Sequence, residues 1–196
     1  MNEFADDLLA ALTRIVRELE SLGVAYYVGG STASSNYGVA RSTLDVDLVA
    51  DLSQVHVDPL AKALQADYYI DARMVADAIE RKSCFNVIHL STSFKVDVFV
   101  VKDRDYDRAA MQRIRKDSLD RDRPSEEYFL AAPEDVVLSK LEWYRLGEEV
   151  SEKQWDDILG VLRVQAGALD RSYLNEWAIK LGVADLLERA FAEAAM

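Results

Sequence analysis

The sequence is poor in the residues that build metal clusters from sulfur and nitrogen. Its 196 residues include one cysteine, Cys84, and two histidines, His56 and His89. A single cysteine cannot form a disulfide within the chain, and these three residues are too few for a Cys/His zinc cluster. A metal site in this chain must therefore be built from oxygen ligands.

Long apolar runs are also missing. No run approaches the roughly 20 residues that a bilayer-spanning helix requires, and acidic residues precede the first apolar stretch, where a secretory signal would carry basic ones. We therefore expect a cytoplasmic protein without a membrane partner. Three prolines and eight glycines leave few breakpoints, and the length suits one domain, or a domain with a small appendage.

Basic residues are in the minority. The chain has 23 lysines and arginines against 35 aspartates and glutamates, so its formal net charge is −12. Such a surface repels phosphate backbones, and extended DNA binding is not expected. Small molecules, proteins and metal-bound nucleotides are easier partners, although Arg113, Arg115 and Lys116 could form one local basic patch for an RNA end.

Apolar spacing predicts a helix, then mixed strands and helices, then a helical tail. Three- and four-residue spacing indicates helices, and two-residue alternation or short β-rich runs indicate strands. The expected helices cover residues 1–22, a stretch starting near 32, 58–66, 71–82, a stretch starting at Pro133, 152–166, 171–181 and 183–194. The expected strands cover 24–28, 45–51, 68–70, 85–90 and 94–101, with the last two forming a hairpin.

The highly charged segment 103–127 is expected to form a helix that runs into a loop ending at Pro124. This is the best candidate for a domain junction, so we predict an α/β domain over residues 1–125 and a helical region over residues 126–196. The order of elements indicates the α+β class, with a mixed β-sheet flanked by helices and a C-terminal helical bundle.

Two aspartates lie two residues apart on one expected strand. Asp45 and Asp47 therefore project from the same face, where like charges repel each other unless a cation lies between them. Strands disfavour aspartate, so the pair calls for compensation. A hard divalent ion supplies it, because magnesium prefers oxygen ligands and is typically held by one or two carboxylates and substrate phosphates.

A third aspartate lies on a later strand. Asp97 shares a face with Lys95, while Val96, Val98 and Val100 point the other way. If this strand pairs beside the one that bears the first two aspartates, three carboxylates converge. Two-metal phosphoryl or nucleotidyl transfer needs such an arrangement, in which one ion orients the triphosphate and the other activates the attacking hydroxyl.

A glycine pair precedes these aspartates. Gly29, Gly30 and Ser31 join an expected strand to an expected helix. Free backbone N–H groups and the positive end of the helix dipole suit a phosphate at such a turn. The glycines let the backbone approach the anion closely, and the serine hydroxyl can add a hydrogen bond.

Together these motifs resemble the polymerase-β-type nucleotidyltransferase superfamily. Its signature is GG[S/T], a spacer, D-x-[D/E] and a third carboxylate downstream. The form Arg41-Ser42-Thr43-Leu44-Asp45-Val46-Asp47 is most similar to the AbiEii/AbiGii toxin-like branch and to related small bacterial nucleotidyltransferases. In that branch one later helix carries a lysine and another an aspartate, and Lys140 and Asp157 lie where those residues would be. The match covers roughly residues 24–162.

The resemblance implies a role for each residue of the first motifs. Asp45 and Asp47 would ligate magnesium, and Asp97 would complete the site and act as the base. Two Mg²⁺ ions are implied, and Mn²⁺ would be an alternative metal. Gly30 and Ser31 would hold the β- and γ-phosphates.

The resemblance also assigns the later residues. Lys140 would reach the triphosphate, and Asp157 would help to place the acceptor or the lysine. Arg41 would lie near the phosphates or anchor its loop. The strongly negative charge of the chain is awkward for a toxin that modifies tRNA ends.

We therefore expect a magnesium-dependent nucleotidyltransferase that moves a nucleoside monophosphate from an NTP to a hydroxyl. The acceptor is an RNA end, a small molecule or a protein side chain. A component of a toxin–antitoxin system, with a cognate antitoxin as partner, is one form of this hypothesis. The alternative is a catalytically inactive protein of the same fold that binds a nucleotide or a protein partner.

Overall fold

A computed structural model describes residues 3–41, 43, 45–120 and 122–195 of the chain. The chain forms two compact units. Unit 1 comprises Met1–Val28 and Thr43–Leu130, and unit 2 comprises Gly29–Ser42 and Ala131–Met196. The short segment around residues 29–42 thus belongs with the C-terminal helices. The predicted domains are residues 1–125 and 126–196, and this division of the chain stays a prediction.

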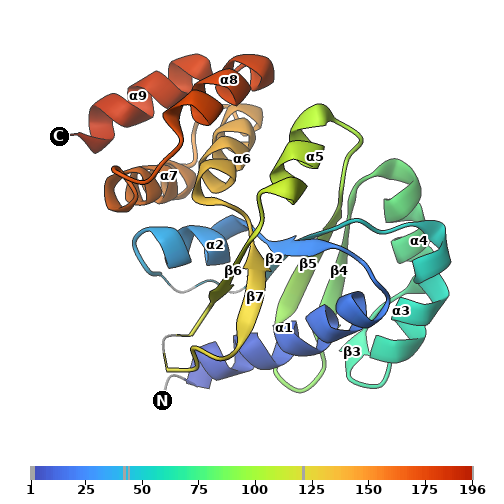
Figure 1. Ribbon diagram of the computed structural model, residues 1–196. Helices are drawn as coiled ribbons and strands as arrows, with labels where there is room; N and C mark the ends of the chain where they lie inside the picture. Colours follow the sequence, from blue (N-terminus) through green and yellow to red (C-terminus); the bar gives the residue numbers. More distant parts are fainter. Residues whose placement is uncertain (1–2, 42, 44, 121, 196) are drawn as a thin grey trace. The chain divides into compact units, whose positions relative to one another are not determined.

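Unit 1 is built on a mixed sheet. Its described residues form seven strands in the order β3-β4-β5-β2-β1-β7-β6 (Figure 1). The strands are β1 (Tyr26–Val28), β2 (Asp45–Ala50), β3 (Tyr68–Tyr69), β4 (Cys84–His89), β5 (Lys95–Val100), β6 (Arg115–Ser118) and β7 (Glu127–Leu130). β2 pairs with β5 in parallel, as does β1 with β7, and the other neighbours are antiparallel. The prediction of an α+β fold with a mixed sheet is confirmed.

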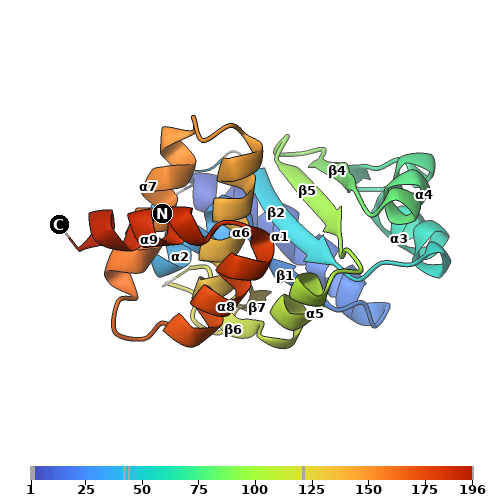
Figure 2. The ribbon, with the colours of Figure 1, turned by 90° about the horizontal axis from the view of Figure 1, so that it is seen from above.

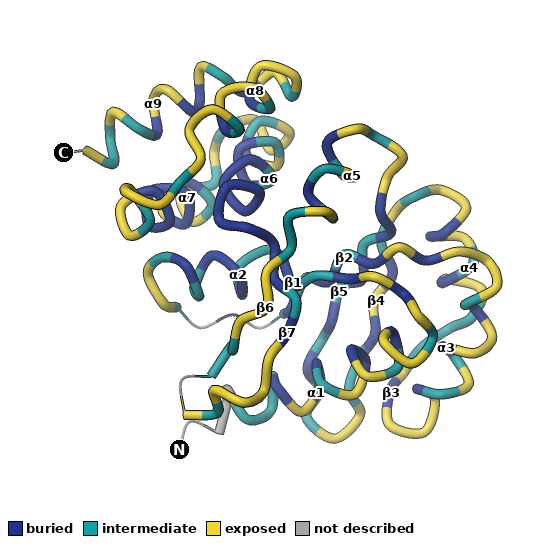
Figure 3. The backbone as a smooth tube through the Cα atoms, in the orientation of Figure 1, coloured by how far each residue is buried: buried dark blue, intermediate teal, exposed yellow. Residues whose placement is uncertain are grey.

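Helices cover this sheet and supply its core. The helices of unit 1 are α1 (Glu3–Ser21), the 3₁₀ turn η1 (Gln54–His56), α3 (Val57–Leu64), α4 (Ala72–Arg81) and α5 (Asp105–Gln112). α1 contacts β2 and β5, α4 contacts β4 and β5, and α3 packs against both of these helices. Buried and less buried positions alternate along β2 and β5 (Figure 3), as expected for strands with one face in a core.

The prediction for the charged segment 103–127 was wrong for residues 115–118, which form a strand. A helix does form there, but it ends at Gln112, and β6 follows it before the turn around Pro124 that leads into β7. β6 has the sequence Arg-Lys-Asp-Ser, with its first three residues exposed, and it lies at the edge of the sheet. Such an edge strand is held by backbone hydrogen bonds to its one neighbour, so its side chains need no apolar alternation, which is the signal used to find strands.

Unit 2 consists of helices. They are α2 (Gly30–Tyr37), α6 (Pro133–Leu146), α7 (Glu152–Val164), α8 (Arg171–Leu181) and α9 (Ala184–Ala194). α2 contacts α6 and α7, α6 contacts α7 and α8, and α9 contacts α7 and α8, which confirms the expected C-terminal bundle (Figure 1). Ser151 and Asp170 cap α7 and α8 by accepting hydrogen bonds from backbone N–H groups. Among the described residues, no helix has the length and apolarity to cross a membrane.

Helices α2 and α7 approach each other closely at a glycine. A Cβ atom on Gly38 would lie 2.8 Å from the backbone nitrogen of Val161 and 2.9 Å from the carbonyl carbon of Gly160. Both neighbours are backbone atoms in the middle of a helix, so neither can move without distorting α7. The position that ends α2 therefore requires glycine for space and not for its φ angle of −129°.

We predict that Gly38→Ala destabilises unit 2 by about 1–3 kcal/mol, the usual cost of forcing a methyl group into a packed interior. Gly167→Ala is the matched control, because no atom lies within 4 Å of the Cβ position there. All three tryptophans belong to unit 2, so urea unfolding followed by tryptophan fluorescence measures the effect. Equal unfolding midpoints for the two variants would contradict the close approach of α2 and α7.

Candidate active site

Strands β2 and β5 bring the predicted acidic residues together. In their parallel register Asp45 pairs with Lys95, and Asp47 pairs with Asp97. Figure 2 shows the two strands side by side. Because side chains alternate between the faces of a strand, these four residues share one face of the sheet. The strand bearing Asp97 therefore does lie beside the strand bearing the other two aspartates, as the sequence predicts.

The opposite face of the same strands explains this register. Val46 and Leu48 on β2, and Val96 and Val98 on β5, are at most 1% exposed. A slip of one residue would bring these side chains to the outer face and turn the carboxylates into the core. Each buried apolar side chain contributes roughly 1.5–3 kcal/mol, so the core holds the acidic residues in place on the other face.

Two polar neighbours interact with the acidic residues. The Lys95 ammonium donates a hydrogen bond to Asp97 Oδ2 at 2.5 Å and lies 3.9 Å from Asp45 Oδ2. That hydrogen bond raises the pKa of Lys95, and the partial burial of the ammonium opposes the rise. The buried Thr43 hydroxyl lies 2.9 Å from Asp45 Oδ1 and 3.1 Å from the backbone oxygen of Asp45. Thr43 therefore orients one carboxylate, and Lys95 links two of them.

The donor atoms of this cluster suit a hard divalent cation. Asp97 Oδ1 is buried and accepts no hydrogen bond from the described residues, and a buried carboxylate oxygen without a partner is costly. As the side chains stand, no three His, Cys, Asp or Glu residues in the described part of the chain converge closely enough to hold an ion. The three carboxylates nevertheless occupy neighbouring positions on one face, and an all-oxygen donor set is the one that Mg²⁺ prefers.

The thiol of Cys84 is also affected by the charges of the acidic residues. Cys84 is the first residue of β4, which pairs with β5 along the edge that faces away from β2. Burial raises the pKa of the Cys84 thiol to about 11, and the charges of Asp97 and Asp47 add to the rise. The thiol is therefore protonated at neutral pH and is not a nucleophile there.

The glycine pair forms a tight entry into α2. Gly29 follows β1 directly and precedes the helix, and its carbonyl accepts a hydrogen bond from the Ala33 N–H group. Gly30 has a φ angle of +53°, a conformation that residues with a side chain rarely adopt. The first N–H groups of a helix lack partners within the helix, so this turn has donors available for an anion.

A buried ionic cluster lies within unit 2. Arg41 donates two hydrogen bonds to the Asp157 carboxylate, both at 2.7 Å, and Lys140 Nζ donates to the same carboxylate at 2.8 Å. Arg41 also donates to the hydroxyl of Ser31. The side chains of Lys140 and Asp157 are only 7% and 6% exposed, whereas that of Arg41 is 24% exposed. One carboxylate thus binds two cations.

The cations decide the ionisation of the carboxylate. Burial alone would raise the pKa of Asp157, but the hydrogen bonds and charges of Arg41 and Lys140 outweigh it and lower the pKa. Asp157 is therefore ionised at neutral pH. A fork of two hydrogen bonds from a guanidinium is among the strongest and most directional contacts in proteins, so the carboxylate fixes the orientation of Arg41.

The predicted site residues fall into two groups. Asp45, Asp47 and Asp97 are neighbours in unit 1. The residues predicted to bind the nucleotide all belong to unit 2, namely Gly29, Gly30, Ser31, Arg41, Lys140 and Asp157, and the last four form the ionic cluster. Ser42 and Leu44 of the predicted motif lie outside the described residues.

Sequence reasoning assigned no role to Lys95 or Thr43. Thr43 lies two residues before Asp45, and Lys95 lies two residues before Asp97. Because side chains alternate along a strand, Lys95 shares the face of Asp97. That spacing was a usable signal. It became informative only once the register of β2 and β5 was known, because Lys95 also contacts the other strand.

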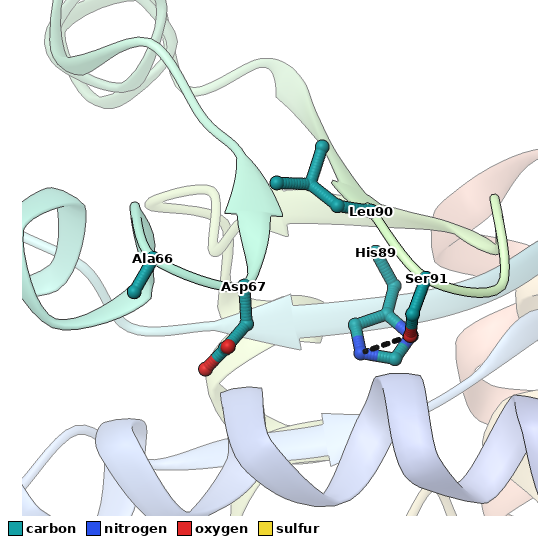
Figure 4. Close-up of a pocket in the computed structure, with 5 residues that line it drawn as sticks. All are labelled: Ala66, Asp67, His89, Leu90 and Ser91. Atoms are coloured by element: carbon teal, nitrogen blue, oxygen red, sulfur yellow. Dashed lines mark hydrogen bonds between the residues drawn. The ribbon is translucent and has the colours of Figure 1, made fainter.

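A separate hollow of about 290 Å³ lies at the edge of the sheet formed by β3 and β4. It is lined by Ala66, Asp67, His89, Leu90 and Ser91 (Figure 4). His89 contacts the hydroxyls of Ser91 and Thr92, which follow it in the turn between β4 and β5. These contacts close the turn, so we assign His89 a structural role.

Solved structures of other proteins share this fold. No protein-family model and no curated protein sequence matches the chain. The antibiotic-resistance factor ANT(2″)-Ia in solution is similar over 92% of this chain and 95% of its own, with 13% identity and a TM-score of 0.53. A nucleotidyltransferase-like protein from Paracoccidioides brasiliensis is similar over 95% and 93%, with 16% identity and a TM-score of 0.56.

A second structure of ANT(2″)-Ia, in complex with adenylyl-2″-tobramycin, agrees with these. It covers 88% of this chain and 95% of its own, with 12% identity and a TM-score of 0.57. At these identities the likeness concerns the fold. The chain therefore has the nucleotidyltransferase fold that its motifs predict, over nearly the whole length of each of these proteins.

We predict that Asp157→Asn lowers the free energy of unfolding of unit 2 by about 3–5 kcal/mol near pH 6, because the buried Lys140 and the partly buried Arg41 lose their counter-ion. The folded pKa of Asp157 is lowered. Its contribution is therefore complete above the unfolded pKa of about 3.9 and is lost as the pH falls below it. Urea unfolding monitored by tryptophan fluorescence should show the difference between wild type and variant shrinking near pH 3.

Asp156→Asn is the matched control, because Asp156 is the adjacent residue on α7 and is exposed. We expect its unfolding free energy to stay within about 0.5 kcal/mol of wild type. A difference between wild type and Asp157→Asn that does not change between pH 6 and pH 3 would contradict the assignment of Asp157 as the ionised partner.

Proposed function

We propose that this protein is a magnesium-dependent nucleotidyltransferase, which transfers a nucleoside monophosphate from an NTP to a hydroxyl group. One observation carries the proposal. The parallel register of β2 and β5 aligns Asp47 with Asp97 and leaves Asp45 on the same face. Structural similarity to nucleotidyltransferases over nearly the full chain supports it.

In the proposed reaction the acceptor hydroxyl oxygen attacks the α-phosphorus of the NTP. The bond from that phosphorus to the oxygen bridging to the β-phosphate breaks, and pyrophosphate leaves with the bond's electron pair. Asp97 takes the hydroxyl proton. Asp45, Asp47 and Asp97 would together serve as the metal ligands. Magnesium, bound as one or two ions, would stabilise the charge on the phosphates and on the attacking oxygen, and Mn²⁺ could replace it.

The ionic cluster of unit 2 is proposed to bind the triphosphate. Arg41 and Lys140 supply positive charge, Ser31 supplies a hydroxyl, and the turn at Gly29 and Gly30 supplies backbone N–H groups. Asp157 acts as a positioning residue, because it holds both cations. The two cationic side chains of the cluster and the partial exposure of Arg41 support this assignment.

A small molecule is the acceptor that we favour. The net charge of −12 disfavours an RNA end and suits a neutral or cationic compound. One structure of the same fold holds an adenylylated antibiotic, adenylyl-2″-tobramycin. A toxin that modifies RNA ends and pairs with a cognate antitoxin would need a more basic surface. RNA and protein acceptors remain outcomes of the experiment below.

We predict that Asp45→Asn, Asp47→Asn and Asp97→Asn each lower the rate of label transfer from an α-labelled NTP by at least about a hundredfold. Each removes a charge that stabilises the transition state, an effect on the order of 3 kcal/mol or more. The assay combines the purified chain, Mg²⁺ and each NTP with a panel of hydroxylated small molecules, total RNA and a protein extract.

Asp51→Asn is the matched control, because Asp51 is exposed and directly follows β2. We expect it to retain the wild-type rate. Label transfer that persists in all three cluster variants would refute the proposed site. Binding of Mg²⁺ and NTP without transfer to any acceptor would favour the inactive nucleotide-binding alternative.

We predict that Arg41→Gln and Lys140→Gln each weaken NTP binding about tenfold, because each removes a charge proposed to contact or support the triphosphate. Isothermal titration with a non-hydrolysable NTP and Mg²⁺ measures the dissociation constant. Lys153→Gln is the control, since Lys153 is exposed on α7. Unchanged NTP affinity in folded Arg41→Gln protein would refute the role of the cluster.

A further inference from the structure

Lys95 lies among the three carboxylates that are proposed to hold the metal. It faces Asp45 across β2 and β5, and it precedes Asp97 by two residues on the same strand. Its ammonium touches Asp97 Oδ2 at 2.5 Å and lies 3.9 Å from Asp45 Oδ2. One carboxylate from each strand thus already interacts with the ammonium group of Lys95.

This cation and a divalent metal need the same oxygen atoms. Magnesium binds carboxylate oxygens at about 2.0–2.1 Å, so an ion on Asp97 Oδ2 would stand within the space that the ammonium occupies. Two positive ions at that separation also repel each other strongly. The side chain of Lys95 is 39% exposed, and a lysine has four flexible methylene groups, so the ammonium is able to leave.

The charge of the cluster leads to the same conclusion. Three carboxylates on adjacent positions of two strands repel one another. Lys95 offsets part of this repulsion in the protein without metal, and the buried Asp97 Oδ1 stays without a hydrogen bond from the described residues. One carboxylate oxygen therefore binds the lysine, and the other is left for a different cation.

We propose that Lys95 is an internal counter-ion that occupies part of the metal site and must release Asp97 and Asp45 before a divalent ion binds. Lys95 thereby weakens metal binding to the free protein and stabilises the cluster when no metal is present. The inference rests on the proposed function, because it takes the three aspartates as the metal ligands.

Direct Mn²⁺ binding to the full chain at neutral pH tests the proposal, with free Mn²⁺ measured by electron paramagnetic resonance and no nucleotide present. We expect Lys95→Gln to bind Mn²⁺ roughly ten- to a hundredfold more tightly than wild type, because a competing charge about 4 Å away is removed. Lys102→Gln removes the same charge from an exposed position just after β5, and we expect wild-type affinity. Equal or weaker binding in Lys95→Gln would overturn the proposal.

A measurement on the wild-type chain covers the case in which Lys95→Gln does not fold. With ¹⁵N-labelled lysine, the Nζ resonance of Lys95 should move on addition of Mg²⁺ towards that of the exposed Lys102. Lys95→Arg, which keeps the charge, identifies the resonance by its loss. A Lys95 resonance that stays unchanged while Mg²⁺ binds would overturn the proposal.

Asp45→Asn separates this proposal from the one on which it rests. If Asp45→Asn abolishes Mn²⁺ binding and Lys95→Gln does not tighten it, the three aspartates hold the metal and only the counter-ion role fails. If Asp45→Asn leaves Mn²⁺ binding intact, both proposals fail. If neither wild type nor Lys95→Gln binds Mn²⁺, the counter-ion proposal fails, and the label-transfer assay alone decides the proposed function.

Discussion

The parallel pairing of β2 and β5 is the constraint on which the candidate active site depends. Apolar side chains on one face of the two strands are buried in the core, and the register that buries them sets the positions of the aspartates on the other face. A slip of one residue would exchange the two faces. Hydrophobic burial on one side of the sheet therefore positions the charges on the other.

Charged groups in both units are held by partners of opposite sign. In unit 1 the ammonium of Lys95 links Asp97 and Asp45, and in unit 2 the carboxylate of Asp157 links Arg41 and Lys140. The first cluster offers carboxylate oxygens, which suit a divalent cation, whereas the second offers cationic donors, which suit a phosphate.

Local periodicity explains why most of the fold was predictable. Elements with a clear apolar repeat, such as α1 and α7 and the central strands β2 and β5, lie within a few residues of their expected bounds. β6 was missed because an edge strand with exposed side chains carries no such repeat. The grouping of the segment 29–42 with the C-terminal helices has no signal in local periodicity, because it depends on contacts between α2 and α7, such as that of Gly38 with Gly160.

The sequence alone determined which residues share a face of each strand, because the two-residue period is a local property of the backbone. It also determined that any metal site would use oxygen ligands, because the chain has only one cysteine and two histidines. Only the tertiary structure decided that Lys95 lies opposite Asp45, and that Asp157 holds both Arg41 and Lys140. Such pairings join residues distant in the chain, and their energy depends on the register and packing that folding creates.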